Sequence, residues 1–315
     1  MNSKLLITTA LGLMAFGTQA GHALAGEGAS SNITLGATTF QTPVIPGPGF
    51  YYSNYVNYYH ATRLTDGDGN SLVPDFSVDA WVDYNQFVYV PPVEFGDLTF
   101  GIGAIVPFAS VRQDAGGTIS ESKGLADIVL QPLIIGWKKD NFHAVLVQGV
   151  IAPTGTYDAS SDVNVGRNTW QYQPQLSLGY VDPDGLELTA TMTYITSGTN
   201  KDPMNFFANV TNSPYKTGDE LGVDFALGYN FTPKFEMGLT GYYYQQLSAD
   251  KIKDPVGDAV LQQNFNGFKG RVAALGIGAR YLSEYGEFYA QVNREFAAEN
   301  RTEGTSAWLR WSVAF

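Results

Sequence analysis

The sequence predicts an all-β fold, a transmembrane antiparallel up-and-down β-barrel of about twelve strands, from three observations. Runs of strand length alternate apolar and polar residues along most of the chain, which is the pattern of strands with two unlike faces. The connections between these runs are alternately short and long. The N-terminus has the form of a secretory signal, and no later segment approaches the ~18 apolar residues of a membrane-spanning helix.

The first residues predict the compartment. Lys4 precedes an apolar run over residues 5–16, and Ala23 to Ala25 has the A-x-A form that signal peptidase recognises. We therefore expect residues 1–25 to be a signal peptide cleaved after Ala25. The chain contains no cysteine, which excludes disulfides, thiolate metal sites, a cysteine nucleophile and a lipid-modified N-terminus.

Residues 26–48 show neither the period of a strand nor that of a helix. This N-terminal segment either extends into the periplasm or folds into the lumen of the barrel, and both alternatives remain open. The barrel itself is expected over residues 49–315.

The C-terminal strand carries the clearest alternation. Ala307, Leu309, Trp311, Val313 and Phe315 share one face, with Trp308, Arg310, Ser312 and Ala314 on the other. This pattern, ending in phenylalanine, is typical of the strand that the outer-membrane assembly machinery recognises, which we expect to be a partner. Other regular runs cover 170–180, 186–194, 221–231 and 235–244, and less regular ones cover 49–63, 76–90, 98–112, 124–138, 142–153, 269–282 and 286–297.

The connections provide an independent indication of the same class. The short ones are Pro91–Asp97, Lys138–Asn141, Val181–Gly185, Thr232–Pro233 and Ser283–Gly286. The long ones are Leu64–Leu72, Gln113–Lys123, Thr154–Gly166, Ser197–Lys216, Leu247–Phe268 and Ala298–Gly304. Barrels of the Gram-negative outer membrane have short periplasmic turns, long outer loops and an even number of strands, whereas soluble sandwiches show no such alternation. We therefore expect this chain in that membrane, in contact with lipid.

Composition narrows the choice of partners. The formal net charge of −12 argues against nucleic acid, because phosphates favour lysine and arginine. The acidic residues are expected in solvated loops.

The polar face of the strands is expected to line the lumen. The strand pattern assigns the following charged and amide side chains to it: Asp79, Asp83, Asp224, Glu236, Lys234, Arg280, Glu287, Gln291, Glu295, Arg310, Gln171, Gln173, Gln175 and Glu187. Buried charges must be hydrated or paired. They therefore either line a water-filled path or form salt bridges that stiffen a plugged interior.

A solute path is predicted from a subset of these residues. Its members are Arg280, Arg310, Glu236, Asp224, Glu287 and Gln291, with the aromatic residues Tyr242, Tyr244 and Trp308. The aromatic side chains are expected to stack on a ring, while Arg280 and Arg310 attract a carboxylate.

Catalytic, cofactor and metal sites are not expected. His60 and His143 are predicted near opposite ends of the barrel, so they cannot share a metal ion, and neither has the partners of a hydrolase triad. Residues 66–70 resemble part of a calcium loop but lack its terminal glutamate. We interpret them as an outer hairpin loop.

One stretch resembles a known family. Pro153, Thr154, Gly155 and Tyr157 are followed by Gly166, Asn168 and Trp170, in a pattern similar to the P-T-G-x-Y … G-x-N-x-W motif of the phenol-degradation meta-pathway outer-membrane proteins. Supporting pieces are Gly124–Asp127, Gly136–Trp137 and Pro46–Tyr52. Members of this family are β-barrels described as transporters and linked to aromatic catabolism. The resemblance implies uptake of hydrophobic or aromatic compounds and supplies no catalytic or binding residue. The motif itself is interpreted as structural, with Pro153 and Gly155 ending a strand and Trp170 anchoring the next strand at the interface.

Two hypotheses for the function follow. The first is a passive outer-membrane channel for small hydrophobic or aromatic compounds. The second is a non-transporting barrel whose lumen is sealed by residues 26–48 and whose loops bind an external partner.

Overall fold

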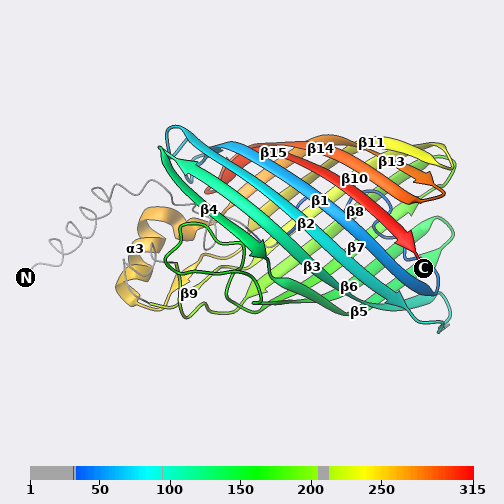
Figure 1. Cartoon of the computed structure of the whole chain (residues 1–315), viewed down its shortest axis with the longest axis horizontal. Helices are drawn as coiled ribbons and strands as arrows, with labels where there is room; N and C mark the ends of the chain where they lie inside the picture. Colours follow the sequence, from blue (N-terminus) through cyan, green and yellow to red (C-terminus); the bar gives the residue numbers. More distant parts are fainter. Residues whose placement is uncertain (1–30, 32, 94, 205–212) are drawn as a thin grey trace, which may run out of the picture.

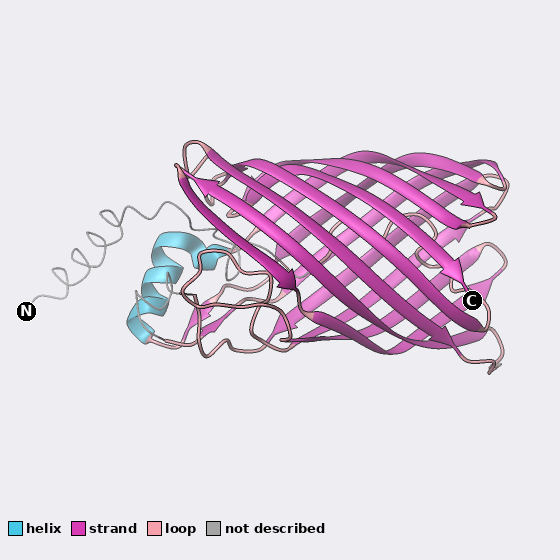
Figure 2. Cartoon of the chain, viewed as in Figure 1, coloured by secondary structure: helices cyan, strands magenta, loops and turns pink. Residues whose placement is uncertain are grey.

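The chain forms a closed antiparallel β-barrel, shown by the computed structural model, which describes residues 31, 33–93, 95–204 and 213–315 (Figure 1). Thirteen hydrogen-bonded strands make the sheet, and it closes through an additional pairing of β2 with β3. Strands β4 and β5 both pair with β3, one after the other along its length, and together occupy one position of the ring. The barrel is therefore twelve-stranded, as the alternation predicts. Figure 2 shows that strand dominates the molecule.

The strands of the barrel are β1 (Gly49–Leu64), β2 (Phe76–Val90), β3 (Leu98–Ala115), β4 (Thr118–Leu125), β5 (Ile128–Lys139), β6 (Phe142–Ala152), β7 (Gln171–Val181), β8 (Leu186–Ser197), β10 (Glu220–Thr232), β11 (Phe235–Gln246), β13 (Arg271–Ser283), β14 (Gly286–Glu299) and β15 (Thr302–Ala314). Outside the ring are the short strands β9 (Tyr215–Lys216) and β12 (Lys251–Ile252), the helix α3 (Pro255–Phe265) and the 3-10 turn η1 (Asn266–Phe268).

The two faces of most strands differ as the membrane requires. On β10, for example, Leu227 is 43% exposed and points outward, while its neighbour Ala226 is buried in the lumen. The backbone groups of the strands pair around the ring, while β4, at the outer end, pairs with β3 alone. The last strand, β15, pairs with β1, and the amide of Phe315 donates to the carbonyl of Phe50.

The connections follow the predicted alternation at most positions. All five predicted short turns join neighbouring strands at the end of the barrel where the C-terminus lies, which we name the periplasmic end (Figure 1). The longer connections and α3 lie at the other end, which we name the outer end. The barrel is that of an outer-membrane protein of a Gram-negative bacterium.

Three of the predicted long loops are wrong in detail. The loop expected over 113–123 is mostly strand, because β3 and β4 form a hairpin with a two-residue turn at Gly116 and Gly117, whose positive φ angles of 61° and 90° suit such a turn. The loop expected over 298–304 is reduced to a turn at Asn300 and Arg301 between β14 and β15. The loop expected over 247–268 contains α3.

Helix α3 belongs to a small cap at the outer end. The side chain of Asp254 accepts a hydrogen bond from the amide of Gly257 and begins the helix at Pro255. The cap has its own apolar cluster, formed by Met204, Tyr215, Ile252, Leu261 and Phe268. In the described ranges, no helix has the length and apolarity needed to cross a membrane. The predicted signal peptide lies outside the described residues.

Candidate functional site

The N-terminal segment, of which residues 31 and 33–48 are described, enters the lumen. The carboxylate of Asp224 on β10 accepts hydrogen bonds from the amide of Gly36 (2.9 Å), the amide of Thr38 (3.0 Å) and the hydroxyl of Thr38 (2.6 Å). The amide side chain of Gln291 donates to the carbonyl of Gly36. Since these partners lie on different strands, the segment crosses the interior of the barrel. Of the two alternatives left open by the sequence, the lumenal one describes these residues.

Further contacts fix the segment toward the periplasmic end. Phe40 is fully buried and meets the ring of Tyr289 edge-on, with the ring centres 5.7 Å apart. The amide of Gln41 donates to the carboxylate of Glu187 over 2.6 Å.

Two inward glycines give the segment room to pass. A β-carbon at Gly136 would collide with Ile45, and one at Gly179 would collide with Pro43. Because both neighbours belong to the N-terminal segment, these two positions accommodate it where a larger residue would exclude it.

A buried ionic network lies at the same level as this lower part of the segment. Arg280 contacts the carboxylate of Glu236 at 2.8 Å and that of Glu287 at 3.3 Å, and it donates to Asn230 at 3.1 Å. Arg310 contacts the other oxygen of Glu287 at 2.7 Å. The two arginines that were expected to attract a solute carboxylate are therefore already paired with carboxylates of the barrel. This arrangement matches the alternative in which lumenal charges form salt bridges.

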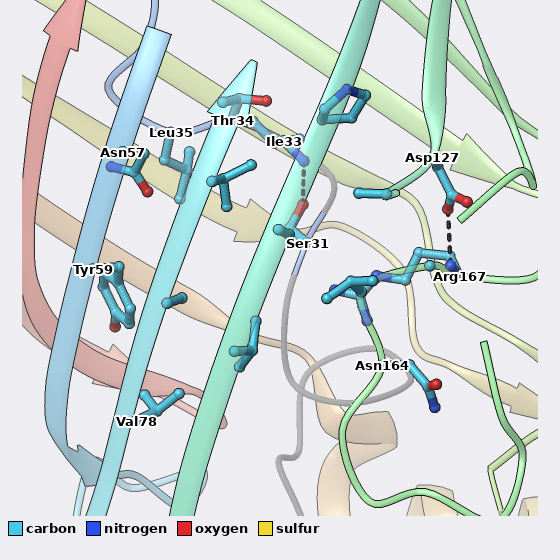
Figure 3. A pocket seen from close by; sticks show the side chains of 18 of the residues that line it. Ser31, Ile33, Thr34, Leu35, Asn57, Tyr59, Val78, Asp127, Asn164 and Arg167 are labelled. Atoms are coloured by element: carbon cyan, nitrogen blue, oxygen red, sulfur yellow. Dashed lines mark hydrogen bonds between the residues drawn. The ribbon is translucent and has the colours of Figure 1, made fainter. Parts of the chain in front are cut away.

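An open cavity of about 280 Å³ occupies the outer half of the lumen (Figure 3). Its floor is the N-terminal segment, with Ile33, Thr34 and Leu35 lining it. One wall, from β2 and β3, consists of small and apolar side chains: Val78, Ala80, Val82, Pro107, Ala109 and Val111. This wall offers a solute an apolar surface.

The rest of the lining, which comes mainly from β1, β11, β14 and β15, is aromatic and internally hydrogen-bonded. The hydroxyls of Tyr59 and Tyr242 both donate to Glu295, over 2.7 and 3.0 Å, and Arg301 lies 3.8 Å from the same carboxylate. The ring of Trp308 stacks on that of Tyr84 with the centres 5.7 Å apart, and all these residues line the cavity.

The predicted path residues thus divide into two groups. Tyr242 and Trp308 line the cavity. Tyr244 is buried beside it, with its ring 4.6 Å from the guanidinium carbon of Arg301 and its hydroxyl on Glu220. The remaining path residues, Asp224, Glu236, Arg280, Glu287, Gln291 and Arg310, lie in the lumen around or below the N-terminal segment.

The family motif forms the rim of the cavity. The carboxylate of Asp127, between β4 and β5, accepts hydrogen bonds from the amide of Gly155 (2.9 Å) and the amide of Arg167 (2.8 Å), the second of which is visible in Figure 3. Gly155 and Gly166 touch backbone to backbone, so a side chain at either would collide with the other. The motif therefore ties the loop after β6 to the break between β4 and β5.

The other motif residues extend this rim. Pro153 and Thr154 follow the end of β6, and the hydroxyl of Tyr157 donates to the carbonyl of Asp202 over 2.8 Å. Asn168 adopts a φ of 54° and donates to Asn200. Trp170, 57% exposed, directly precedes β7. Pro153 thus lies directly after the end of β6, as predicted, whereas the anchoring role of Trp170 stays a prediction.

Three charged residues assigned to the lumen do not lie there. Asp79 and Asp83 point outward, because Val78, Ala80 and Val82 between and beside them line the cavity and side chains alternate along β2. Lys234 lies exposed in the periplasmic turn before β11. The assignment failed on β2 because this strand carries polar residues on both faces. Gln171, Gln173, Gln175, Glu187 and Glu295 share the inward face of their strands.

The histidines and the loop over residues 66–70 lie where expected. His60 is in the outer half of β1, and His143 is the second residue of β6, at its periplasmic end. The carboxylate of Asp66 accepts from the amides of Asp68 (2.9 Å) and Asn70 (2.8 Å), and the Asn70 bond is the main cause that lowers the pKa of Asp66. The loop is thus closed by its own hydrogen bonds. Over the described ranges, no group of three or more histidine, aspartate or glutamate side chains is arranged to hold a metal ion.

Comparison with known proteins identifies the family of this chain. Residues 61–311 match the family described as "Putative MetA-pathway of phenol degradation". The chain belongs to this family. The match includes the motif at the cavity rim and all strands from β2 to β14, which confirms the resemblance.

One solved structure supports the same fold. The COG4313 outer membrane channel from Pseudomonas putida F1 superimposes with a TM-score of 0.75 at 15% identity, over 86% of this chain and 97% of the other. The beta domain of the Bordetella autotransporter BrkA gives a TM-score of 0.48 at 12% identity, over 85% of this chain and 100% of the other. A search of curated protein sequences finds no match to this chain.

Proposed function

We propose that this protein is a passive outer-membrane channel for the uptake of small hydrophobic or aromatic compounds. The observation that carries the proposal is the cavity in the outer half of the lumen, with an apolar wall on β2 and β3 and aromatic rings facing it. The family, described by its link to phenol degradation, supports the same substrate class.

The size and chemistry of the cavity suit such solutes. An apolar cavity of about 150 Å³ holds a benzene molecule. A cavity of about 280 Å³ therefore has room for a substituted ring. Transfer of a solute from water to this wall is favourable by ~25 cal/mol for each Å² of apolar surface that it buries. The stacked rings of Tyr84 and Trp308 offer an aromatic solute a further contact.

The charges of the lumen favour neutral solutes over aromatic acids. Arg280 and Arg310 are both paired with Glu287, and Arg301 lies beside Glu295. An incoming carboxylate would have to compete with these pairs. We therefore expect phenols and neutral aromatic compounds to enter more readily than benzoates.

Passage beyond the cavity requires the N-terminal segment to move, because its residues form the floor and contact the wall at Asp224, Glu187 and Tyr289. These contacts favour a second candidate function, a non-transporting barrel with a sealed lumen whose loops bind an external partner. Deletion of residues 26–48 is expected to raise conductance under either candidate, so the intact protein has to separate them. If the segment is a plug, conductance appears on its deletion, and solute entry into the intact protein distinguishes a movable plug from a permanent one.

A substitution that fills the cavity tests the proposal directly. Ala109 points into the cavity from β3, whereas Ala104 points outward from the same strand, level with Phe87. We expect Ala109→Phe to reduce the uptake of a neutral phenol into proteoliposomes at least fivefold, while the matched control Ala104→Phe leaves it unchanged. Equal uptake by both folded variants would contradict a route through this cavity.

An enzymatic role is not proposed. We expect the folded protein to hydrolyse neither phospholipids nor esters and to need no cofactor. Turnover of either substrate class by purified protein would contradict this expectation.

A further inference from the structure

The outward face of β1 and β2 carries polar side chains at a depth where β8 and β10, on the opposite wall, present apolar ones. The side chain of Asn54 donates to Asp83, and the side chain of Asn85 donates to the other carboxylate oxygen of Asp83 over 3.3 Å. The hydroxyl of Tyr52 donates to Asn85 over 2.6 Å. All four residues alternate with inward neighbours, so this network lies on the outside of the barrel.

A second outward group lies closer to the outer end. The carboxylate of Asp79 accepts from the hydroxyl of Tyr58 (2.6 Å) and lies 2.9 Å from a ring nitrogen of His60. On β3 and β4, Arg112 pairs with Glu121. We name the two groups together the outward polar strip, consisting of Asn54, Tyr58, His60, Asp79, Asp83, Asn85, Arg112 and Glu121.

The strip reaches into the hydrocarbon layer. Phe87 is part of an aromatic cluster with Phe50 and Tyr52 at the periplasmic end of the barrel. Asp83 lies four residues further along β2, which at ~3.3 Å per residue and a strand tilt of ~40° is about 10 Å deeper into an apolar band ~25 Å tall. Its side chain is therefore placed where acyl chains would surround it in an isolated barrel.

The opposite wall shows what a lipid-facing surface of this barrel looks like. The outward residues at comparable levels are Leu188, Ala190 and Met192 on β8 and Phe225, Leu227 and Tyr229 on β10. Among the residues that the structure describes, no cation pairs with Asp83. A carboxylate held only by two amides in hydrocarbon is costly unless another polar surface covers it.

We propose that the outward polar strip is the interface of a two-fold dimer, covered by the same strip of a second copy of this chain. A two-fold axis along the membrane normal keeps every residue at its own depth, so each group meets the groups of the partner copy at the same level. At the deeper level the strip holds the carboxylate of Asp83 together with the amide donors of Asn54 and Asn85. Toward the outer end it holds the carboxylate of Asp79 together with His60 and Arg112.

Each level therefore contains both acceptors and donors, which makes the strip complementary to itself. Trp81, 54% exposed, lies between the two levels with its ring centre 4.5 Å from that of Tyr58, and it supplies an apolar contact to the interface. This inference is independent of the proposed uptake, since the strip lies on the other face of the barrel wall from the cavity.

Cysteine cross-linking tests the dimer in the intact protein. The chain has no cysteine of its own, so a single introduced thiol reports its own surroundings. Val56 lies outward on β1 between Asn54 and Tyr58, and Leu227 lies on β10, six positions away around the ring from β2. In outer membranes treated with a short bifunctional maleimide, Val56→Cys is expected to give a band of twice the mass of the chain, and the matched control Leu227→Cys is expected to remain a monomer.

A second variant tests the role of the polar groups. Asn54→Leu combined with Asp83→Leu, in the Val56→Cys background, is expected to lose at least nine tenths of the cross-linked band while retaining the heat-modifiable migration of a folded barrel. Equal cross-linking at Val56 and Leu227 would overturn the proposal, as would a Val56→Cys monomer. A cross-linked band of any other mass would show that a different protein covers the strip and would equally contradict a dimer. If the leucine variant still formed the dimer, the strip would not be part of the dimer interface.

Discussion

Phe40 is the residue by which we expect the N-terminal segment to be held most strongly. Its side chain is fully buried among Ala226 and Tyr289, and its ring meets the latter edge-on at 5.7 Å. Truncation of a buried phenylalanine to alanine costs about 3–5 kcal/mol in a packed core. Because the lost contacts join the segment to the barrel wall, most of this cost should weaken docking of the segment and leave the barrel folded.

The lower estimate already predicts a large effect. A loss of about 3 kcal/mol, at about 1.4 kcal/mol for each factor of ten, raises the ratio of undocked to docked segment roughly 150-fold. Thr42, which lies two residues beyond Phe40, provides a reporter as Thr42→Cys, because no other thiol is present. We expect Phe40→Ala to accelerate labelling of this thiol by a bulky water-soluble maleimide by about two orders of magnitude and to increase the open time in single-channel recordings.

A matched substitution controls for general loosening of the barrel. Phe231 on β10 is 59% exposed on the lipid face, and Phe231→Ala removes the same atoms without touching the segment. It should leave the labelling rate unchanged. If both variants label equally fast, or neither differs from the parent, Phe40 does not hold the segment and the docking contacts must be sought elsewhere.

Three further perturbations have defined outcomes. Burial raises the pKa of Asp250 to about 7, so the folded outer cap favours the protonated carboxyl. The cap is therefore most stable below about pH 4 and loses stability as the pH rises toward 7. Asp250→Asn should abolish this dependence in hydrogen-exchange measurements between pH 4 and 8. Asp127→Ala leaves two backbone amides without their acceptor, at about 1–3 kcal/mol each, so tryptic cleavage after Arg167 should accelerate at least tenfold. Arg280→Met leaves Glu236 buried without its cation and should lower the urea midpoint of unfolding by the equivalent of about 3–5 kcal/mol, and Glu236→Gln in the same chain should recover most of this loss.

The topology was predictable because the bilayer imposes it on the sequence. A strand with lipid on one side must place apolar residues at every second position, and the short turns at one end alternate with longer connections at the other. Both features are local and can be read without knowing which strands pair. The same reasoning was weaker on β2, where polar residues occupy both faces between Val78 and Gln86, so that alternation alone did not show which face was inward.

Asp79 and Asp83 were wrongly assigned to the lumen, and the outward polar strip explains why. Polarity was taken as the mark of the lumen, which holds where lipid covers the outside. It fails where the outside of a strand is polar as well, and the deviation then marks a surface with a different neighbour. The register of β2 against β1 depends on partners 17 to 41 residues apart and is not encoded in either strand alone.

The position of the N-terminal segment in the lower lumen could not be predicted in this way, because it depends on contacts between residues much further apart in the sequence. Asp224 accepts a hydrogen bond from Gly36, which is 188 residues away in the sequence, and no local pattern in residues 26–48 predicts this partner. Two indirect signals were nevertheless present. An inward carboxylate without a nearby cation needs donors, which the backbone amides of an irregular segment can supply. Glycines at the inward positions 136 and 179 leave space in a lumen that side chains would otherwise fill, and the N-terminal segment occupies that space with Ile45 and Pro43. Strand alternation identifies such inward glycines, but only some of them mark a second segment, because others, such as Gly276, face only neighbouring strands of the barrel.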